Sequence, residues 1–437
     1  MRTPMRKSKS RNFREVNLGY SDEEAAKEAS RCMQCGDPGC IKGCPLEIDI
    51  PGFIRCIKNG DVGGASDIIR SRNQFPGITC RTCSNEKLCE KGCNNEDKIS
   101  IAHLERYASD REKKKMPRLV KRGGKIAVAG SGPAGLSCAH DLALKGYNVT
   151  VYEAMHDYGG VLRYSVPDFK LPKKYLDTEI ELMKKMGVKF IPNHIICRTE
   201  KIDELLNDYD IVFLCTGIGI REMLKIRGAQ LGNVSTANEF LMNINLFGER
   251  KFPRGRKPQE VAVIGGNCQT LDAARAARRL GANVSVVAQG YFDSLSAKDE
   301  DIEYAREEGI DFVFLSRPQR VIGSKQAEGI ELIQMMFQDN GNGHKETVPI
   351  ENTEFVLPCD YVIFANTPGP NTLLADTTNL SHKIDKRIIV DSKYRTSLKN
   401  VFAGGAVIGS KSIIKSIYDG KKAAFHIDEY LKSTSYL

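Results

Sequence analysis

Two runs of cysteine near the N-terminus have the types and spacing of redox-active metal ligands. Thiolates are soft, anionic ligands that suit iron–sulfur clusters or zinc. At this spacing, clusters that carry electrons are the favoured occupants. The runs are Cys32-x2-Cys35-x4-Cys40-x3-Cys44-Pro45 and Cys80-x2-Cys83-x5-Cys89-x3-Cys93.

The proline after Cys44 indicates how the cysteines divide. In bacterial-type ferredoxin runs the cysteine of such a C-P ending ligates the other cluster, and this ending argues against a pair of zinc sites. By the same logic Cys93 crosses back from the second run. We expect a first cluster at Cys32, Cys35, Cys40 and Cys93. We expect a second at Cys44, Cys83, Cys89 and one further ligand, for which Cys80 is one candidate.

A glycine-rich turn predicts a first dinucleotide site within residues 125–154, which read as strand, turn, helix and second strand. Its glycines allow a tight turn, close approach of a pyrophosphate and close packing of helix on strand. Glu153 ends the second strand, where a carboxylate accepts ribose hydroxyls. The candidate residues here are Gly130, Gly132, Pro133, Ala134, Gly135 and Glu153.

The same rhythm recurs in residues 260–289, which predicts a second dinucleotide unit. Its turn begins Gly265-Gly266-Asn267. Asn tolerates a left-handed backbone, but its side chain occupies space that a pyrophosphate needs. Thr270 replaces the third small residue and is expected to crowd the helix against the strand.

These patterns predict an α/β chain. We expect a helical two-cluster iron–sulfur domain, followed by two Rossmann-like domains in which the second interrupts the first. Residues 401–431 read as a strand, a glycine turn and a helix that complete the first Rossmann domain. The expected parts are the iron–sulfur domain 1–110, a linker 111–124, the first dinucleotide domain 125–250 and 366–437, and the second 251–365.

Composition narrows the setting. The start is basic and lacks an apolar signal segment, and no apolar run approaches the ~20 residues that span a bilayer. The sequence therefore predicts a cytoplasmic protein without membrane insertion, in which fourteen cysteines favour metal over disulfides. Basic residues in the first fourteen positions and from Arg111 to Lys125 form a solvated tail and linker, or a docking surface for an acidic carrier or partner. Without interleaved aromatic residues they do not favour nucleic acid.

Residues 12–110 resemble an iron–sulfur domain shared by three groups of oxidoreductases. These are the glutamate synthase small subunit, the N-terminal part of dihydropyrimidine dehydrogenase and the large subunit of NADH-dependent ferredoxin:NADP oxidoreductase. The similar segments are 12–20, 28–54, 89–93 and 99–110. The resemblance implies that an oxygen ligand in HLERY, here Glu105, completes the second cluster, with Cys80 as the alternative. A carboxylate ligand would shift that cluster's potential.

The resemblance continues into the first dinucleotide unit and implies FAD there. Tyr158 to Lys173 is similar to the family's flavin-side segment, with Gly160 and Arg163 as candidate contacts. Cys215-Thr216-Gly217 is similar to the family's A-T-G motif, which adds Thr216 and Gly217. The family's late G-G-D motif is Gly404-Gly405-Ala406 in this chain, which retains Gly405 and loses the aspartate. The family's A-x-G motif before P-N is Ala365-Asn366-Thr367. One lost carboxylate contact costs about 1–3 kcal/mol, so FAD is still expected.

In the family the second turn holds NADPH, with an Arg-Arg pair after the following strand. Here that pair is Gln289-Gly290, which supplies neither an Arg for a 2′-phosphate nor an acid for a 2′-hydroxyl. Three outcomes stay open: weak NAD(H) use, NADP(H) held by other residues, or no nicotinamide nucleotide.

Together these features predict an oxidoreductase that moves electrons between a nicotinamide nucleotide, FAD and two [4Fe–4S] clusters. The expected setting is a larger redox complex, with a partner redox subunit or an acidic carrier such as ferredoxin. The alternative is a relay subunit with FAD and clusters but no functional NAD(P)H site. No nucleophile or acid–base dyad is predicted, because electron transfer needs none.

Overall fold

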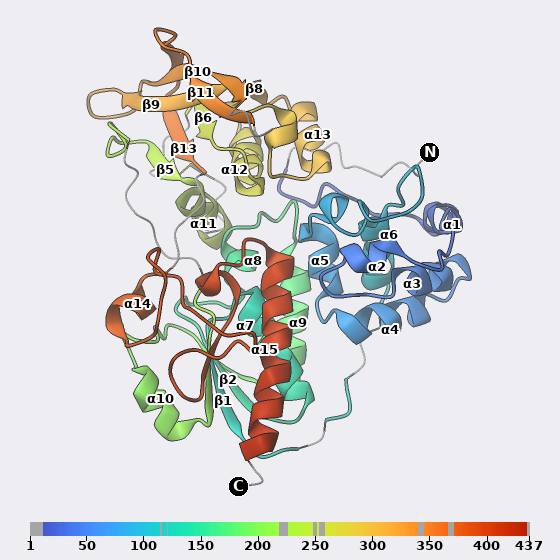
Figure 1. Cartoon of the computed structure of the whole chain (residues 1–437). Helices are drawn as coiled ribbons and strands as arrows, with labels where there is room; N and C mark the ends of the chain where they lie inside the picture. Colours follow the sequence, from blue (N-terminus) through green and yellow to red (C-terminus); the bar gives the residue numbers. More distant parts are fainter. Residues whose placement is uncertain are drawn as a thin grey trace.

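The chain comprises a helical N-terminal unit, two separate parallel sheets and an antiparallel sheet. The computed structural model describes residues 12–113, 116–119, 121–217, 226–247, 251–252, 258–339, 345–365 and 371–434. The basic residues before Asn12 and the segment 366–370 therefore lie outside the described residues. Figure 1 shows the helical unit beside the first sheet. The second sheet lies beyond one end of the first sheet.

The helical unit begins where the sequence predicts. Ser21 accepts from Glu24 N and Glu24 returns the contact, which confirms the capping box at the start of the first helix. Buried Phe53, Ile69 and Leu104 form the centre of the unit. The helices are α1 (Asp22–Ser30), α2 (Gly39–Gly43), α3 (Ile50–Lys58), α4 (Val62–Arg72), α5 (Pro76–Thr82) and α6 (Ile101–Asp110), with the 3-10 helix η1 (Asn85–Lys87).

The first sheet is parallel, in the order β14-β4-β1-β2-β3. Its central strands are apolar runs, as expected for strands buried on both faces. The last strand, β14, pairs with β4, so the chain returns here after forming the second sheet. The strands are β1 (Lys125–Ala129), β2 (Asn148–Tyr152), β3 (Lys189–Ile191), β4 (Ile211–Leu214) and β14 (Val401–Ala403).

Helices cover this sheet, and Figure 1 shows the long C-terminal helix α15 lying beside α7. Helix α5 of the N-terminal unit packs on α9 and α15, which joins that unit to the first sheet. The helices are α7 (Pro133–Leu144), α8 (Val161–Tyr164), α9 (Lys173–Lys185), α10 (Ile202–Asp208), α14 (Leu373–Thr377) and α15 (Ile413–Thr434).

The second parallel sheet has the order β5-β13-β6-β7-β8. Strand β5 lies at the edge of this sheet, where it pairs with β13 far along the chain. The second unit therefore begins before residue 250, the boundary expected from the sequence. The elements are β5 (Val234–Thr236), α11 (Ala237–Phe247), β6 (Glu260–Ile264), α12 (Cys268–Arg279), β7 (Asn283–Val287), the 3-10 helix η3 (Phe292–Ser294), α13 (Asp299–Glu307), β8 (Asp311–Val313) and β13 (Tyr361–Phe364).

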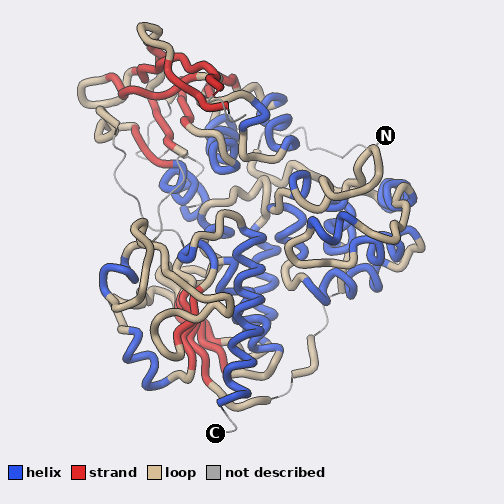
Figure 2. The backbone as a smooth tube through the Cα atoms, viewed as in Figure 1, coloured by secondary structure: helices blue, strands red, loops and turns tan. Residues whose placement is uncertain are grey.

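An antiparallel layer that the sequence analysis missed adjoins the second sheet, and Figure 2 shows these strands gathered at one end of the molecule. Long strand β10 pairs with all three others. The strands are β9 (Ser316–Ile322), β10 (Gly329–Asp339), β11 (Lys345–Pro349) and β12 (Phe355–Pro358). Across the described parts of the chain, no helix combines the length and apolarity needed to cross a membrane.

Candidate functional site

The loops after α1 and before α6 bring one set of cysteines together. Burial raises the pKa of Cys40 to about 11, and the neighbouring thiols of Cys93 and Cys32 add to the rise. Burial also raises the pKa of Cys32, with Cys93 and Cys35 contributing. A side chain at Gly39 would collide with the carbonyl of Gly92, at 2.3 Å from its Cβ. The two cysteine runs therefore lie directly against each other at this backbone contact.

A second set of thiols lies around the end of α5. Burial raises the pKa of Cys83 to about 12, and Cys44 is among the neighbours that add to the rise. Burial raises the pKa of Cys89 well above its usual value, with Cys83 and Cys44 contributing. A Cβ at Gly43 would lie 2.7 Å from the carbonyl oxygen of Leu88, so the Cys44 loop rests directly on the Cys89 loop.

Glu105 projects from α6 toward this second set. Its Oε1 accepts hydrogen bonds from Thr79 Oγ1 and Asn73 Nδ2, both at 2.9 Å. Burial raises the pKa of Glu105 to about 7, although these two hydrogen bonds oppose the rise. Both bonds reach Oε1, so they leave the second carboxylate oxygen, Oε2, to other partners.

Cys80 lies on α5 with a different environment. Its buried sulfur accepts from Arg81 Nη1 at 3.4 Å. Burial raises the pKa of Cys80 to about 12, and the charged groups that act most on it are Arg81, Glu105 and Asp110. Cys80 thus lies beside an ion-paired arginine, and Glu105 lies near Cys80 as well as near the thiols of the second set.

Within the described residues, no three His, Cys, Asp or Glu side chains converge as ligands of a single metal ion would. A four-iron cluster is much larger than one ion and holds its thiolates further apart. The two sets of thiols thus fit clusters by donor chemistry and number.

The first glycine turn is shaped for a phosphate. Gly130 has φ +118°, which only glycine adopts readily, and a Cβ at Gly135 would lie 1.9 Å from Gly130 O. A Cβ at Gly132 would meet nothing within 4 Å. Pro133 and Ala134 open α7 directly behind this space, so its N-terminal amides can face an anion.

Groups around the turn also fit a dinucleotide. Glu153 follows β2 and accepts from Ser131 N at 3.0 Å, which holds its carboxylate beside the turn. A Cβ at Gly160 would lie 2.8 Å from Gly132 Cα, so the segment after β2 closes against the turn. The hydroxyl of Thr216, next to Gly217, is buried and has no hydrogen-bond partner among the described residues. A cofactor would supply that partner.

Arg163 is placed less favourably for cofactor contact. Its Nε donates to Tyr158 O at 2.6 Å and lies 3.2 Å from Asp157 Oδ2, and its Nη2 pairs with Asp177. The guanidinium thus has carboxylate partners within the protein.

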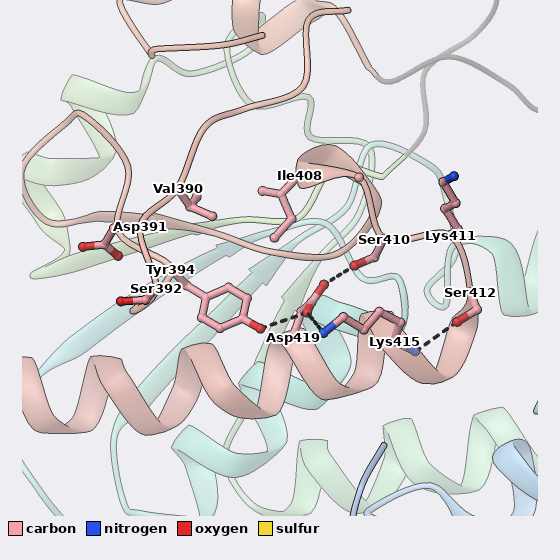
Figure 3. Close-up of a pocket in the computed structure, with 11 residues that line it drawn as sticks. Val390, Asp391, Ser392, Tyr394, Ile408, Ser410, Lys411, Ser412, Lys415 and Asp419 are labelled. Atoms are coloured by element: carbon pink, nitrogen blue, oxygen red, sulfur yellow. Dashed lines mark hydrogen bonds and ion pairs between the residues drawn. The ribbon is translucent and has the colours of Figure 1, made fainter. Parts of the chain in front are cut away.

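Asp419 on α15 was missed by the sequence analysis. Its Oδ2 accepts from Gly405 N at 3.2 Å and from Ser410 Oγ, and its Oδ1 accepts from the hydroxyl of Tyr394 at 2.9 Å. Figure 3 shows this carboxylate at the wall of a pocket of about 560 Å³. A carboxylate from α15 therefore reaches the turn whose expected aspartate is Ala406. The G-G-D motif could not have indicated Asp419, because this residue lies outside the motif, on α15.

The second glycine turn differs from the first. Asn267 has φ −114° and ψ 175°, so its backbone is extended and needs no left-handed conformation, contrary to the expectation. Its Oδ1 accepts from Thr270 N at 3.0 Å, and its Nδ2 donates to Ala365 O at 3.0 Å. The Thr270 hydroxyl accepts from Asn267 N at 3.2 Å and so serves the helix cap. The asparagine side chain occupies the amide end of α12, beside Gly265 and Gly266, that would face a phosphate.

Comparison with known proteins decides the family. Residues 9–117 match the family described as dihydropyrimidine dehydrogenase domain II, 4Fe-4S cluster, and residues 124–424 match pyridine nucleotide-disulphide oxidoreductase. A glutamate synthase [NADPH] small chain from Azospirillum brasilense is 30% identical over 97% of this chain and 92% of its own length. The chain belongs to the glutamate synthase small-chain-like family of oxidoreductases.

Two further proteins are similar to this chain, one in sequence and one in fold. The NAD-dependent dihydropyrimidine dehydrogenase subunit PreT of Escherichia coli is 30% identical over 96% of this chain and 97% of its own length. FprA of Mycobacterium tuberculosis, solved in complex with NADPH, has a TM-score of 0.60 at 18% identity, over 72% of this chain and 86% of that chain. That likeness concerns the fold. The family match makes the chain an FAD/NAD(P)-dependent oxidoreductase with a 4Fe-4S domain.

Proposed function

We propose that the chain is a subunit that passes electrons between a nicotinamide nucleotide, FAD and two [4Fe–4S] clusters. FAD accepts electrons in pairs and releases them singly, which is the chemistry that links a nucleotide to clusters. The chain's own residues then hold the carriers in place and set their environments.

The observation that carries this proposal is the division of the thiols into two sets. Cys32, Cys35, Cys40 and Cys93 supply four thiolates to one cluster. Cys44, Cys83 and Cys89 supply three to the other, and the Oε2 oxygen of Glu105 supplies the fourth ligand. Thr79 and Asn73 orient that carboxylate by holding its Oε1, as outer-shell partners commonly do.

The first turn supports FAD. The open space at Gly132 admits a pyrophosphate against the N-terminal amides of α7. Glu153 is positioned to accept ribose hydroxyls, with Ser131 holding it in place. Thr216 would donate its free hydroxyl to the cofactor, and Gly405 would approach it with its amide fixed by Asp419.

The second turn supports weaker nucleotide binding. The side chain of Asn267 accepts the hydrogen bond of the Thr270 amide, which a pyrophosphate would otherwise accept. After β7, Gln289 and Gly290 provide no charge for a 2′-phosphate or 2′-hydroxyl. We propose NADH in preference to NADPH, because NADH does not require a cationic clamp. The self-capped helix also favours a second candidate function, a relay subunit whose second unit serves only as scaffold.

The relatives support a partner. PreT is named as a subunit of a dihydropyrimidine dehydrogenase, and the Azospirillum protein as the small chain of a glutamate synthase. We propose that this chain likewise works with a partner redox subunit or an acidic carrier such as ferredoxin, to which its net charge of +9 is complementary. We also propose a cytoplasmic location, in which the thiols stay reduced.

An anaerobic titration tests the proposal. The purified chain is titrated with NADH and separately with NADPH while the flavin absorbance is followed, and iron, sulfide and FAD are determined on the same sample. We expect bleaching by NADH, about one FAD and about eight irons per chain. Full cofactor content without bleaching by either nucleotide would favour the relay function. Absence of FAD or iron after reconstitution would contradict both.

A further inference from the structure

A lysine of the second dinucleotide unit lies buried beside the second thiol set. Lys298 precedes α13 and is 5% exposed. Its Nζ donates to the carbonyl of Arg81 at 3.4 Å, two residues before Cys83. The side chain therefore crosses from one unit into the other and ends at the α5 segment that carries a proposed cluster ligand.

Neighbouring contacts hold this lysine in place. Asp299 N donates to Glu86 Oε2 at 2.7 Å, and Lys87 Nζ donates to Leu295 O at 2.9 Å. His103 Nε2 lies 3.7 Å from Glu300 Oε1. The segments 81–87 and 295–300 thus form a joint, and two buried cations lie within it: Arg81, which is paired with Glu15 and Asp110, and Lys298.

Lys298 has no carboxylate within ion-pair distance among the residues that the structure describes. Three carboxylates lie near it beyond that distance, and each has closer partners. Asp301 is engaged by Lys170 and Arg275, Glu300 by Tyr304 and His103, and Glu86 by the amide of Asp299. Burying an ammonium group without a close counter-ion is costly. A neighbouring anionic centre would offset that cost. The Arg81 carbonyl that Nζ reaches lies two residues before the proposed ligand Cys83, so the second cluster would be that anionic centre.

We propose that Lys298 is a positioning residue for electron transfer, whose fixed positive charge raises the reduction potential of the cluster at Cys44, Cys83, Cys89 and Glu105. A nearby positive charge favours the state with one more electron, and burial limits screening of that effect by solvent. The inference rests on the proposed second cluster. It also implies that docking of the second dinucleotide unit adjusts the cluster's affinity for electrons.

The test uses the full chain with its clusters, as wild type, K298M and K298R. Redox titration followed by electron paramagnetic resonance measures the potential of each cluster. We expect K298M to lower the equilibrium constant for reducing the second cluster about tenfold, which is about 59 mV for one electron. K298R should stay close to wild type, and the first cluster should be unchanged in all samples.

Lys87→Met is the matched control. It removes an exposed lysine of the same joint, whose charge is screened by solvent, and should leave both potentials unchanged. An unshifted second cluster in K298M would overturn the inference, as would an equal shift in Lys87→Met. If K298M does not retain its iron, K298Q replaces it, and loss of the cluster in both would show a purely structural role. About four irons in the wild type would instead contradict the proposed second cluster.

Discussion

Lys170 Nζ lies 2.7 Å from Asp301 Oδ2, and this ion pair joins the first dinucleotide unit to the second. A second carboxylate, Asp272 on α12, lies 3.2 Å from the same nitrogen. All three side chains are at most 10% exposed. Burial alone would lower the pKa of Lys170, but the two carboxylates more than reverse this and raise it. The aspartate of the second Rossmann motif thus binds a neighbouring unit.

Removal of the buried Lys170 ammonium group should weaken the contact between the two dinucleotide units. In Lys170→Met, Asp272 and Asp301 lose their shared partner, and the free energy of unfolding should fall by about 3–5 kcal/mol. Denaturant unfolding measures the change. Lys184→Met, which removes an exposed pair with Glu181, should change stability by less than about 1 kcal/mol. Equal effects of the two variants would show that the buried pair is not special.

Glu105→Ala should disrupt one cluster only. Removal of the proposed oxygen ligand is expected to reduce iron from about eight to about four per chain or to alter one cluster's spectrum, with flavin content unchanged. Iron analysis and electron paramagnetic resonance provide the measurements. Cys80→Ala is the control and should retain all the iron. The reverse pattern would make Cys80 the ligand.

Gly132→Val should release FAD. The added side chain would project into the open space before α7 and exclude the pyrophosphate, so FAD should fall from about one per chain to near zero while the iron remains. Absorbance and FAD extraction measure this. Gly123→Val lies before β1, where a Cβ also meets nothing, and should retain FAD. Stoichiometric FAD in Gly132→Val would place the cofactor elsewhere.

Asn267→Gly should improve use of NADH. Without the asparagine side chain, the amide of Thr270 becomes available to a pyrophosphate, and apparent affinity should rise about tenfold. The rate of flavin reduction at increasing NADH measures this affinity. Asn267→Asp retains the cap but adds a negative charge, and should weaken binding. No response to either substitution would support the relay function.

Stability should rise above neutral pH because of Lys173. Burial lowers the pKa of Lys173 to about 8, although Asp168 opposes this shift. The folded state therefore loses this proton before the unfolded state, so folding becomes more favourable as pH rises from about 8 toward the unfolded pKa of about 10.4.

The wild type should gain about 1–2 kcal/mol between about pH 7.5 and about pH 9.5 relative to Lys173→Met. Arg163, Asp168 and Asp272 are the other charged groups that act on this lysine, and both proteins retain them. Thermal unfolding at several pH values measures the difference. Parallel pH profiles for the two proteins would mean that Lys173 keeps an ordinary pKa.

Local sequence patterns predicted much of the fold. The strand, glycine turn and helix of residues 125–144 follow from backbone sterics and apolar periodicity, which act over a few residues. The capping box at Ser21 is equally local. By contrast, β5 and β9 to β12 escaped prediction, because strand formation depends on partner strands, and β5 pairs with a strand that is distant in sequence.

The sequence by itself determined the ligand-type cysteines, the first dinucleotide turn and the family. Only the tertiary structure decided which side chains meet. It placed Glu105 toward the second thiol set and Cys80 beside Arg81, and it brought Asp419 to Gly405. It also buried Lys298 next to a unit some 200 residues earlier in the chain. Spacing along a chain records local geometry, whereas these contacts depend on how packed elements fold back on one another.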